Sequence, residues 1–160
     1  PQVPFIGMLF SQWGGTLGDP ENCDKMLSNG EAVIVFPEGA RGISKPTSKK
    51  YQLQKVGNGY IHMAVKNKTP IIPVGIVGCE EILINFGNID LFQKLFKFPA
   101  FPSLLPVVFP SKVIMHFGKP IYFDGDIGKE HIIEDMNQQV KNEIKKLIDQ
   151  GLQKRKGVFS

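Results

Sequence analysis

Cysteine is scarce in this sequence of 160 residues, and its two cysteines, Cys23 and Cys79, lie far apart. Zinc sites and thiol redox motifs use closely spaced pairs such as CxxC, and the sequence contains none. Chains held together by disulfides are short and rich in cysteine, so that class is disfavoured as well. We therefore expect reduced thiols, as in a cytosolic setting, and no metal site.

Long apolar runs are missing too. A helix that crosses a bilayer needs about 20 apolar residues, and no segment here reaches that length. The nearest is the uncharged stretch 98–111, which four prolines interrupt, so we expect a surface loop or an interfacial element there. Just before it, phenylalanine and leucine alternate with Lys94 and Lys97. That mixture suits either a membrane headgroup layer or a short helix packed on the core.

Acidic residues are absent between Arg41 and Lys68, although seven basic residues lie there. Such a segment prefers anions, either phosphate groups or an anionic membrane surface. A solvated loop and helix face is the alternative, and the charge pattern by itself favours that alternative. A nucleic-acid function is not supported, because no recognition motif or aromatic platform accompanies the charge.

The hydrophobic content of 42% is enough for one globular domain. Residues 32–36 (AVIVF) and 71–77 (IIPVGIV) are β-rich apolar runs, as in strands buried on both faces. Between them, residues 57–68 place apolar side chains at helical spacing. The pattern predicts a strand–helix–strand unit whose two strands are parallel.

The flanking segments continue the alternation. Asp19 or Asn22 can cap a short helix, residues 113–117 resemble another strand, and a long amphipathic helix is expected from about Lys129 to Lys154. The sequence therefore predicts an α/β fold with a mostly parallel sheet flanked by helices.

The first apolar run ends in the sequence FPEGAR, residues 36–41, and ligands of open α/β sheets bind beyond the carboxyl ends of strands. Gly39 permits a close backbone approach. Glu38 can hydrogen-bond a hydroxylated acceptor, and Arg41 can bind a phosphate group with two N–H donors. The same two side chains can instead brace a tight turn, and their spacing does not separate the two roles.

Residues 36–41 resemble the FPEGTR block of the lysophosphatidate and glycerol-phosphate acyltransferase superfamily, with Ala40 in place of threonine. Residues 69–74 (TPIIPV) resemble the VPIVPV strand of that family. Further similarity lies in residues 4–18 ahead of Glu21 and Asn22, which resemble the family's second motif, and in residues 110–112 and 117–121. The resemblance covers nearly the whole chain and implies that residues 1–160 form the C-terminal portion of a single acyltransferase domain.

The resemblance implies transfer of a fatty acyl group from acyl-CoA or acyl carrier protein to a hydroxyl of a glycerolipid or lysophospholipid. The thioester is then the co-substrate, and no cofactor or metal is implied. The expected location is the cytoplasmic face of a membrane, peripheral or anchored through residues outside this sequence. The implied substrate-binding residues are Glu38 and Gly39 for the acceptor, Arg41 for its phosphate, and Ile72, Pro73 and Val74 of the fourth block.

The family's catalytic motif, HxxxxD, is absent. In that family the histidine is a general base on the acceptor hydroxyl and the aspartate orients it. The residues five positions after His62, His116 and His131 are Asn67, Ile121 and Met136. Because the family places this motif ahead of its second one, where this sequence begins, we expect a truncation, an inactive isolated chain, and a catalytic pair outside residues 1–160.

Residues 13–20 also depart from the family, because many lysophosphatidate acyltransferases carry a phosphate-binding arginine there and this segment has no basic residue. The acceptor is therefore either a neutral or other lipid, or a phosphorylated one whose charge is met by Arg41, Lys45, Lys49 and Lys50. The rival hypothesis is a non-enzymatic lipid- or membrane-binding module. An HxxxxD motif immediately upstream would favour the enzyme, and its absence there would favour the module.

Overall fold

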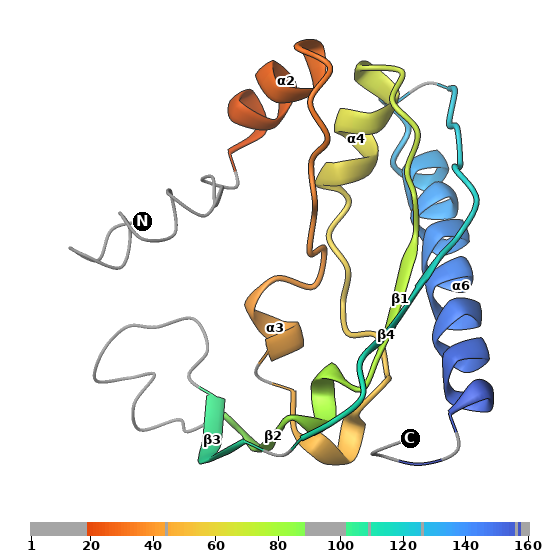
Figure 1. The fold of residues 1–160 in the computed structure, drawn as a ribbon. Helices are drawn as coiled ribbons and strands as arrows, with labels where there is room; N and C mark the ends of the chain where they lie inside the picture. Colours follow the sequence, from red (N-terminus) through yellow and green to blue (C-terminus); the bar gives the residue numbers. More distant parts are fainter. Residues whose placement is uncertain are drawn as a thin grey trace, which may run out of the picture.

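The computed structural model describes residues 19–43, 45–88, 102–108, 110–125, 127–155 and 157. Helical segments come first along these residues, the strands follow from Val74, and a long helix comes last (Figure 1). Their order is α2 (Pro20–Ser28), α3 (Ala40–Ile43), the 3₁₀ turn η1 (Thr47–Lys49), α4 (Gly59–Lys66), β1 (Val74–Val77), the 3₁₀ turn η2 (Cys79–Glu81), β2 (Leu83–Asn88), β3 (Pro102–Val108), β4 (Ile114–Phe117) and α6 (Glu130–Lys154). Within these ranges no helix has the length and apolarity to cross a bilayer.

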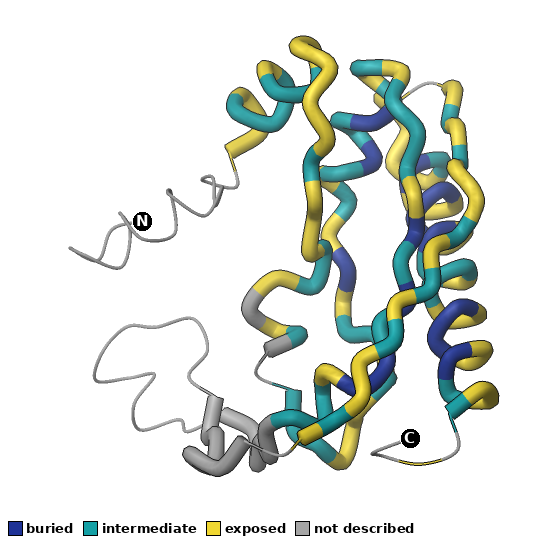
Figure 2. The backbone as a smooth tube through the Cα atoms, viewed as in Figure 1, coloured by how far each residue is buried: buried dark blue, intermediate teal, exposed yellow. Residues whose placement is uncertain are grey.

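The central layer is an antiparallel pair of strands, β1 and β4, with α6 lying along one face (Figure 1). Residues opposite each other in such a pair share a face. Gly75 and Val77 on β1 are buried against α6, whereas Met115 and Phe117 on β4 point away and are 55% and 69% exposed. The sheet therefore has one face covered by α6 and one apolar face that the described residues leave exposed (Figure 2).

Two glycines allow the backbone of α6 to approach this sheet closely. A Cβ atom on Gly75 would lie 2.6 Å from Cβ of Leu147 and 2.8 Å from the backbone nitrogen of Ile148. A Cβ atom on Gly151 would lie 2.7 Å from Cγ2 of Val77. Neither contact leaves room for a side chain, so both positions require glycine for packing.

The amino-terminal half of α6 forms the core together with α4. The buried cluster consists of Ile61, Ile133, Met136 and Val140, and the partly buried side chains around it are Tyr60, Val65, Ile71, Ile121, Phe123, Ile132 and Ile144. Full burial of such a side chain contributes about 1.5–3 kcal/mol. This confirms the predicted amphipathic helix and places its apolar stripe on α4 and the sheet.

A buried asparagine fixes how α4 and α6 meet. Asn137 is 1% exposed; its Oδ1 accepts a hydrogen bond of 2.8 Å from the Tyr60 hydroxyl, and its Nδ2 donates to Asn58 Oδ1. Burial raises the pKa of Tyr60 to about 12, so the phenol stays neutral and remains a donor. Because a buried amide is costly without partners, these bonds select one register between the two helices.

The helix α2 begins as its sequence predicts. Asp19 is the N-cap, and its Oδ1 accepts from the backbone N–H of Glu21 at 3.3 Å. Asp24 then joins α2 to α4: its carboxylate accepts from Lys66 Nζ at 2.8 Å and from Asn67 Nδ2 at 2.9 Å, and these bonds lower its pKa. These two hydrogen bonds connect α2 to the end of α4, just ahead of residues 32–36 in the sequence.

The prediction of a buried strand at residues 32–36 is wrong for the structure described. The segment has no strand assignment, and Ile34 and Phe36 are 84% and 75% exposed. A strand needs a neighbouring backbone with which to exchange hydrogen bonds, and none of the described strands pairs with this run. The mostly parallel sheet is likewise not found, since both strand pairs within the described ranges are antiparallel.

The expectation of a loop or interfacial element at residues 98–111 is also corrected in part. Residues Pro102–Val108 form β3, which pairs antiparallel with β2 through an irregular register. Proline is tolerated in an edge strand because the missing N–H can face away from the partner. The lysine-flanked apolar segment 91–98 and the segment 4–18 lie outside the described residues.

Gly75→Ala in the whole protein should lower the free energy of unfolding by about 1–3 kcal/mol, because the added methyl group must displace the backbone of α6. Gly59→Ala is the matched control: its Cβ would meet no atom within 4 Å at the start of α4. That change should stabilise by about 0.4–1 kcal/mol. Urea unfolding followed by circular dichroism measures both, and equal stabilities would contradict this packing.

Candidate functional site

The segment FPEGAR forms a tight turn, which we call the acceptor turn (residues 36–42). Gly39 has φ of +56°, a left-handed conformation that suits glycine. The N–H of Gly39 donates to the carbonyl oxygen of Phe36 at 2.9 Å, and the N–H of Gly42 donates to that of Gly39 at 3.1 Å. The N–H of Gly57 donates to the carbonyl oxygen of Pro37 at 3.0 Å. The turn is thus defined locally and fastened to the segment that precedes α4.

Glu38 fixes the acceptor turn from within. Its side chain is half-buried, and its Oε1 accepts a hydrogen bond from the backbone N–H of Gln54. A Cβ atom on Gly42 would lie 2.6 Å from Glu38 Oε2, so the carboxylate occupies the space that this glycine leaves. The structure therefore gives Glu38 the bracing role that the sequence left open beside acceptor binding.

Arg41 and the residues just before the turn are open to solvent. Arg41 is exposed on the short helix α3. Ile34, Val35 and Phe36 precede it, with exposed fractions of 84%, 47% and 75%. A cation that closely follows an exposed apolar run matches the two halves of an amphiphile, a charged headgroup and an acyl chain.

Two of the lysines that could meet a phosphate are committed elsewhere. Lys45 Nζ lies 2.8 Å from Glu80 Oε1 and donates to the carbonyl oxygen of Gln52 at 3.0 Å, and its side chain is only 4% exposed. Lys50 Nζ lies 3.2 Å from Glu81 Oε1. Glu80 and Glu81 therefore offset the charges of these two lysines.

A partly buried polar cluster that sequence reasoning missed lies at the carboxyl end of β1. We call it the Tyr51 network; its members are the side chains of Tyr51, Glu81, Ser111 and Arg155 and the backbone of Gly78. The hydroxyl of Tyr51 donates to Glu81 Oε1 at 2.9 Å, and Arg155 forms an ion pair of 2.7 Å with Glu81 Oε2. No spacing rule joins positions so distant in sequence, so only the fold reveals this cluster.

Electrostatics within the Tyr51 network favour one set of protonation states. Burial, together with the hydrogen bond to Glu81, raises the pKa of Tyr51. Burial also disfavours the charged form of Glu81, but the hydrogen bonds that its carboxylate accepts outweigh this effect and lower its pKa. A neutral phenol, a carboxylate and a guanidinium therefore coexist across the physiological range.

The fourth block begins just before β1: Ile72 and Pro73 precede the strand, and Val74 is its first residue. The carbonyl oxygen of Pro73 accepts from the N–H of Gly118 at 2.8 Å, and Val74 pairs with Phe117. Pro73 is buried and Ile72 is 51% exposed. The structure thus separates this block from the Tyr51 network, which lies at the other end of β1.

The histidines are not placed for acid–base work at the acceptor turn. His62 lies within α4, and His131 is exposed at the start of α6. His116 faces α6 from β4, where a Cβ on Gly151 would lie 3.2 Å from its ring. In the described part of the chain no group of three or more His, Cys, Asp or Glu is placed to hold a metal ion.

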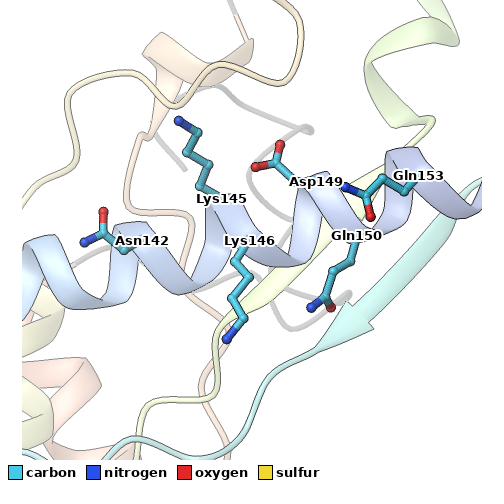
Figure 3. Close-up of a pocket in the computed structure, with 6 residues that line it drawn as sticks. All are labelled: Asn142, Lys145, Lys146, Asp149, Gln150 and Gln153. Carbon is cyan, nitrogen blue, oxygen red and sulfur yellow. The ribbon is translucent and has the colours of Figure 1, made fainter.

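The outer surface of α6 carries an open hollow (Figure 3). Its lining consists of Asn142, Lys145, Lys146, Asp149, Gln150 and Gln153, all from the one helix. All six side chains project from this single helix (Figure 3). This surface has the character of a solvated helix face, so the acceptor turn remains the candidate site.

Glu38→Ala should speed amide exchange at Gln54 by about tenfold or more, because the backbone N–H loses a hydrogen bond to a charged group. Glu38→Gln keeps an oxygen acceptor and should retain most of the protection. Glu31→Ala removes an exposed carboxylate and serves as the control. NMR-detected hydrogen exchange measures all three, and unchanged protection in Glu38→Ala would contradict the bracing role.

Comparison with known proteins finds similarity to acyltransferases along this chain. The family model described as Acyltransferase matches residues 2–77, which include the acceptor turn and β1. An uncharacterized protein of Mycobacterium tuberculosis (strain ATCC 25618 / H37Rv) is 32% identical over 171 residues, covering 98% of this chain and 48% of the relative. The human "DGAT1/2-independent enzyme synthesizing storage lipids" is 26% identical over 151 residues, covering 92% of this chain and 45% of the relative.

A solved structure shares the fold. The crystal structure of the 1-acyl-sn-glycerophosphate (LPA) acyltransferase PlsC from Thermotoga maritima superposes with a TM-score of 0.63 at 20% identity, over 98% of this chain and 54% of that chain. The chain thus spans about half the length of the proteins it matches. Residues 36–41 lie within the part that the Acyltransferase model matches, and together these likenesses support the glycerolipid acyltransferase superfamily for this chain.

Proposed function

We propose that the protein transfers a fatty acyl group from acyl-CoA or acyl carrier protein to a hydroxyl of a glycerolipid or lysophospholipid. The observation that carries this proposal is the acceptor turn together with the residues just before it. Arg41 is exposed in the turn and closely follows the exposed apolar residues Ile34 to Phe36. Two similar proteins, one described as synthesizing storage lipids and one an LPA acyltransferase, support a lipid acceptor.

In the proposed reaction the acceptor hydroxyl attacks the thioester carbonyl. An ester bond forms, the carbon–sulfur bond breaks, and the thiol leaves with the proton that the hydroxyl gives up. This chain supplies acceptor binding and not the base, because residues 1–160 contain no HxxxxD motif. The base is then a histidine of the same enzyme outside this sequence, and residues 1–160 are the C-terminal portion of the catalytic domain.

Each residue of the acceptor turn has a distinct task in this proposal. Arg41 binds the headgroup phosphate with two N–H donors. Gly39 lets the acceptor approach the backbone, and the Glu38 carboxylate holds the turn in shape and accepts from the acceptor where an oxygen remains free. Of the fourth block, Ile72 offers an exposed apolar contact, while Pro73 and Val74 set the start of β1.

The enzyme would act at the cytoplasmic face of a membrane, where its lipid acceptor resides. The exposed apolar residues 34–36 and the basic residues that follow them suit such a surface. The same observation supports the alternative, a non-enzymatic lipid- or membrane-binding module. Both would bind vesicles, so only acyl transfer by the whole protein separates them: product formation supports the enzyme, and binding without product supports the module.

Arg41→Gln in the whole protein should raise the KM for a phosphorylated acceptor about tenfold or more, because a charge-assisted bidentate contact to the phosphate is lost. The KM for a neutral glyceride acceptor and for acyl-CoA should stay within about twofold. Lys119→Gln removes another exposed positive charge, outside the turn, and is the matched control. An unchanged KM for every acceptor would contradict the phosphate role of Arg41.

A further inference from the structure

Three segments that are distant in sequence meet at the carboxyl end of β1. They are the loop 45–52, the turn Gly78–Glu81 with Ser111 beside it, and Arg155, which directly follows α6. Lys45 and the side chains of Glu81 and Arg155 are at most 10% exposed, so the charges in this region are mostly shielded from water. Such a buried arrangement of ions tolerates little displacement, because each charge depends on its partners.

Tyr51 is the centre of this arrangement. Its backbone N–H donates to Glu80 Oε2 at 2.7 Å, and its hydroxyl accepts from the backbone N–H of Gly78 at 3.0 Å while it donates to Glu81. Its φ of +63° is a left-handed conformation that is unfavourable for a bulky residue. Hydrogen bonds of the Tyr51 backbone N–H and of the Tyr51 hydroxyl hold the loop in this unfavourable conformation.

The loop thus held is also fastened to the acceptor turn. Residues 43–57 connect the turn to α4, and within them the N–H groups of Gln54 and Gly57 bind Glu38 and Pro37. Only two residues separate Tyr51 from Gln54, so a shift at Tyr51 is transmitted to the hydrogen bond that braces Glu38. The far end of the same chain of contacts is Arg155, which also donates to Ser111 at 2.9 Å.

We propose that Tyr51, Glu81 and Arg155, which meet at the carboxyl end of β1, are positioning residues that hold the acceptor turn in the conformation that binds the acceptor. This inference rests on the proposed function for its kinetic consequence. Its structural consequence, that the conformation of the acceptor turn depends on Arg155, stands independently.

The test uses the whole protein with Arg155→Gln, Arg155→Lys and Tyr51→Phe. Lys146→Gln on the exposed side of α6 is the control, since Lys146 forms a surface ion pair with Glu143 at 3.5 Å. Hydrogen exchange measured by mass spectrometry should show about tenfold faster exchange in peptides covering residues 36–57 for Arg155→Gln and Tyr51→Phe. Arg155→Lys should fall between these variants and the wild type, and the control should match the wild type.

Steady-state kinetics provide the second readout. Arg155→Gln and Tyr51→Phe should raise the acceptor KM about three- to tenfold while the acyl-CoA KM stays within about twofold. Substitution of a residue with only a general structural role would lower the melting temperature and the active fraction. It would not raise the acceptor KM while leaving the acyl-CoA KM unchanged. Wild-type exchange in residues 36–57, or an unchanged acceptor KM, in both variants would overturn the proposal.

The two proposals fail in distinguishable ways. If the wild-type protein transfers no acyl group, the proposed function is wrong, and the exchange experiment alone decides whether the network positions the turn. If Arg155→Gln does not fold, Tyr51→Phe decides, because it removes one hydroxyl group and leaves the ion pair of Glu81 and Arg155 in place.

Discussion

The close approach of α6 to β1 is the constraint on which the rest of the structure depends. Gly75 and Gly151 remove the two side chains that would keep the helix and the strand apart. The helix can then bury Leu147 and Ile148 against the sheet while its other end packs on α4. In a domain with short strands, this one helix orders both the sheet and α4, so an added methyl group at Gly75 should affect the whole fold.

The same helix connects the core to the candidate site. Because α6 is held against β1, Arg155 at its end reaches Glu81 just beyond the carboxyl end of that strand. Glu81 and Glu80 hold Tyr51, and the segment after Tyr51 holds Glu38. A line of contacts thus runs from helix packing to the acceptor turn. The acyltransferase family suggests what the turn binds, and the Tyr51 network explains how the turn keeps its conformation.

Local sequence patterns predicted what depends on local chemistry. The spacing of Ile133, Met136 and Val140 predicted α6, and Asp19 was one of two residues expected to cap α2. A tight turn at residues 36–41 was one of two alternatives for that segment. The prediction of a strand at residues 32–36 failed because a strand needs a neighbouring backbone to pair with, and apolar composition does not supply one. Tyr51, Glu81 and Arg155 were missed because they meet only through tertiary structure, and the bracing bond of Glu38 could be foreseen only as an alternative.

The central claim is that the acceptor turn binds the lipid acceptor, and photocrosslinking tests it most directly. The whole protein is irradiated with a lysophosphatidate that carries a diazirine close to its phosphate, and the labelled peptides are identified by mass spectrometry. We expect label within residues 36–57 that excess unlabelled lysophosphatidate removes. Label confined to the outer face of α6, or label that the competitor does not reduce, would contradict the account.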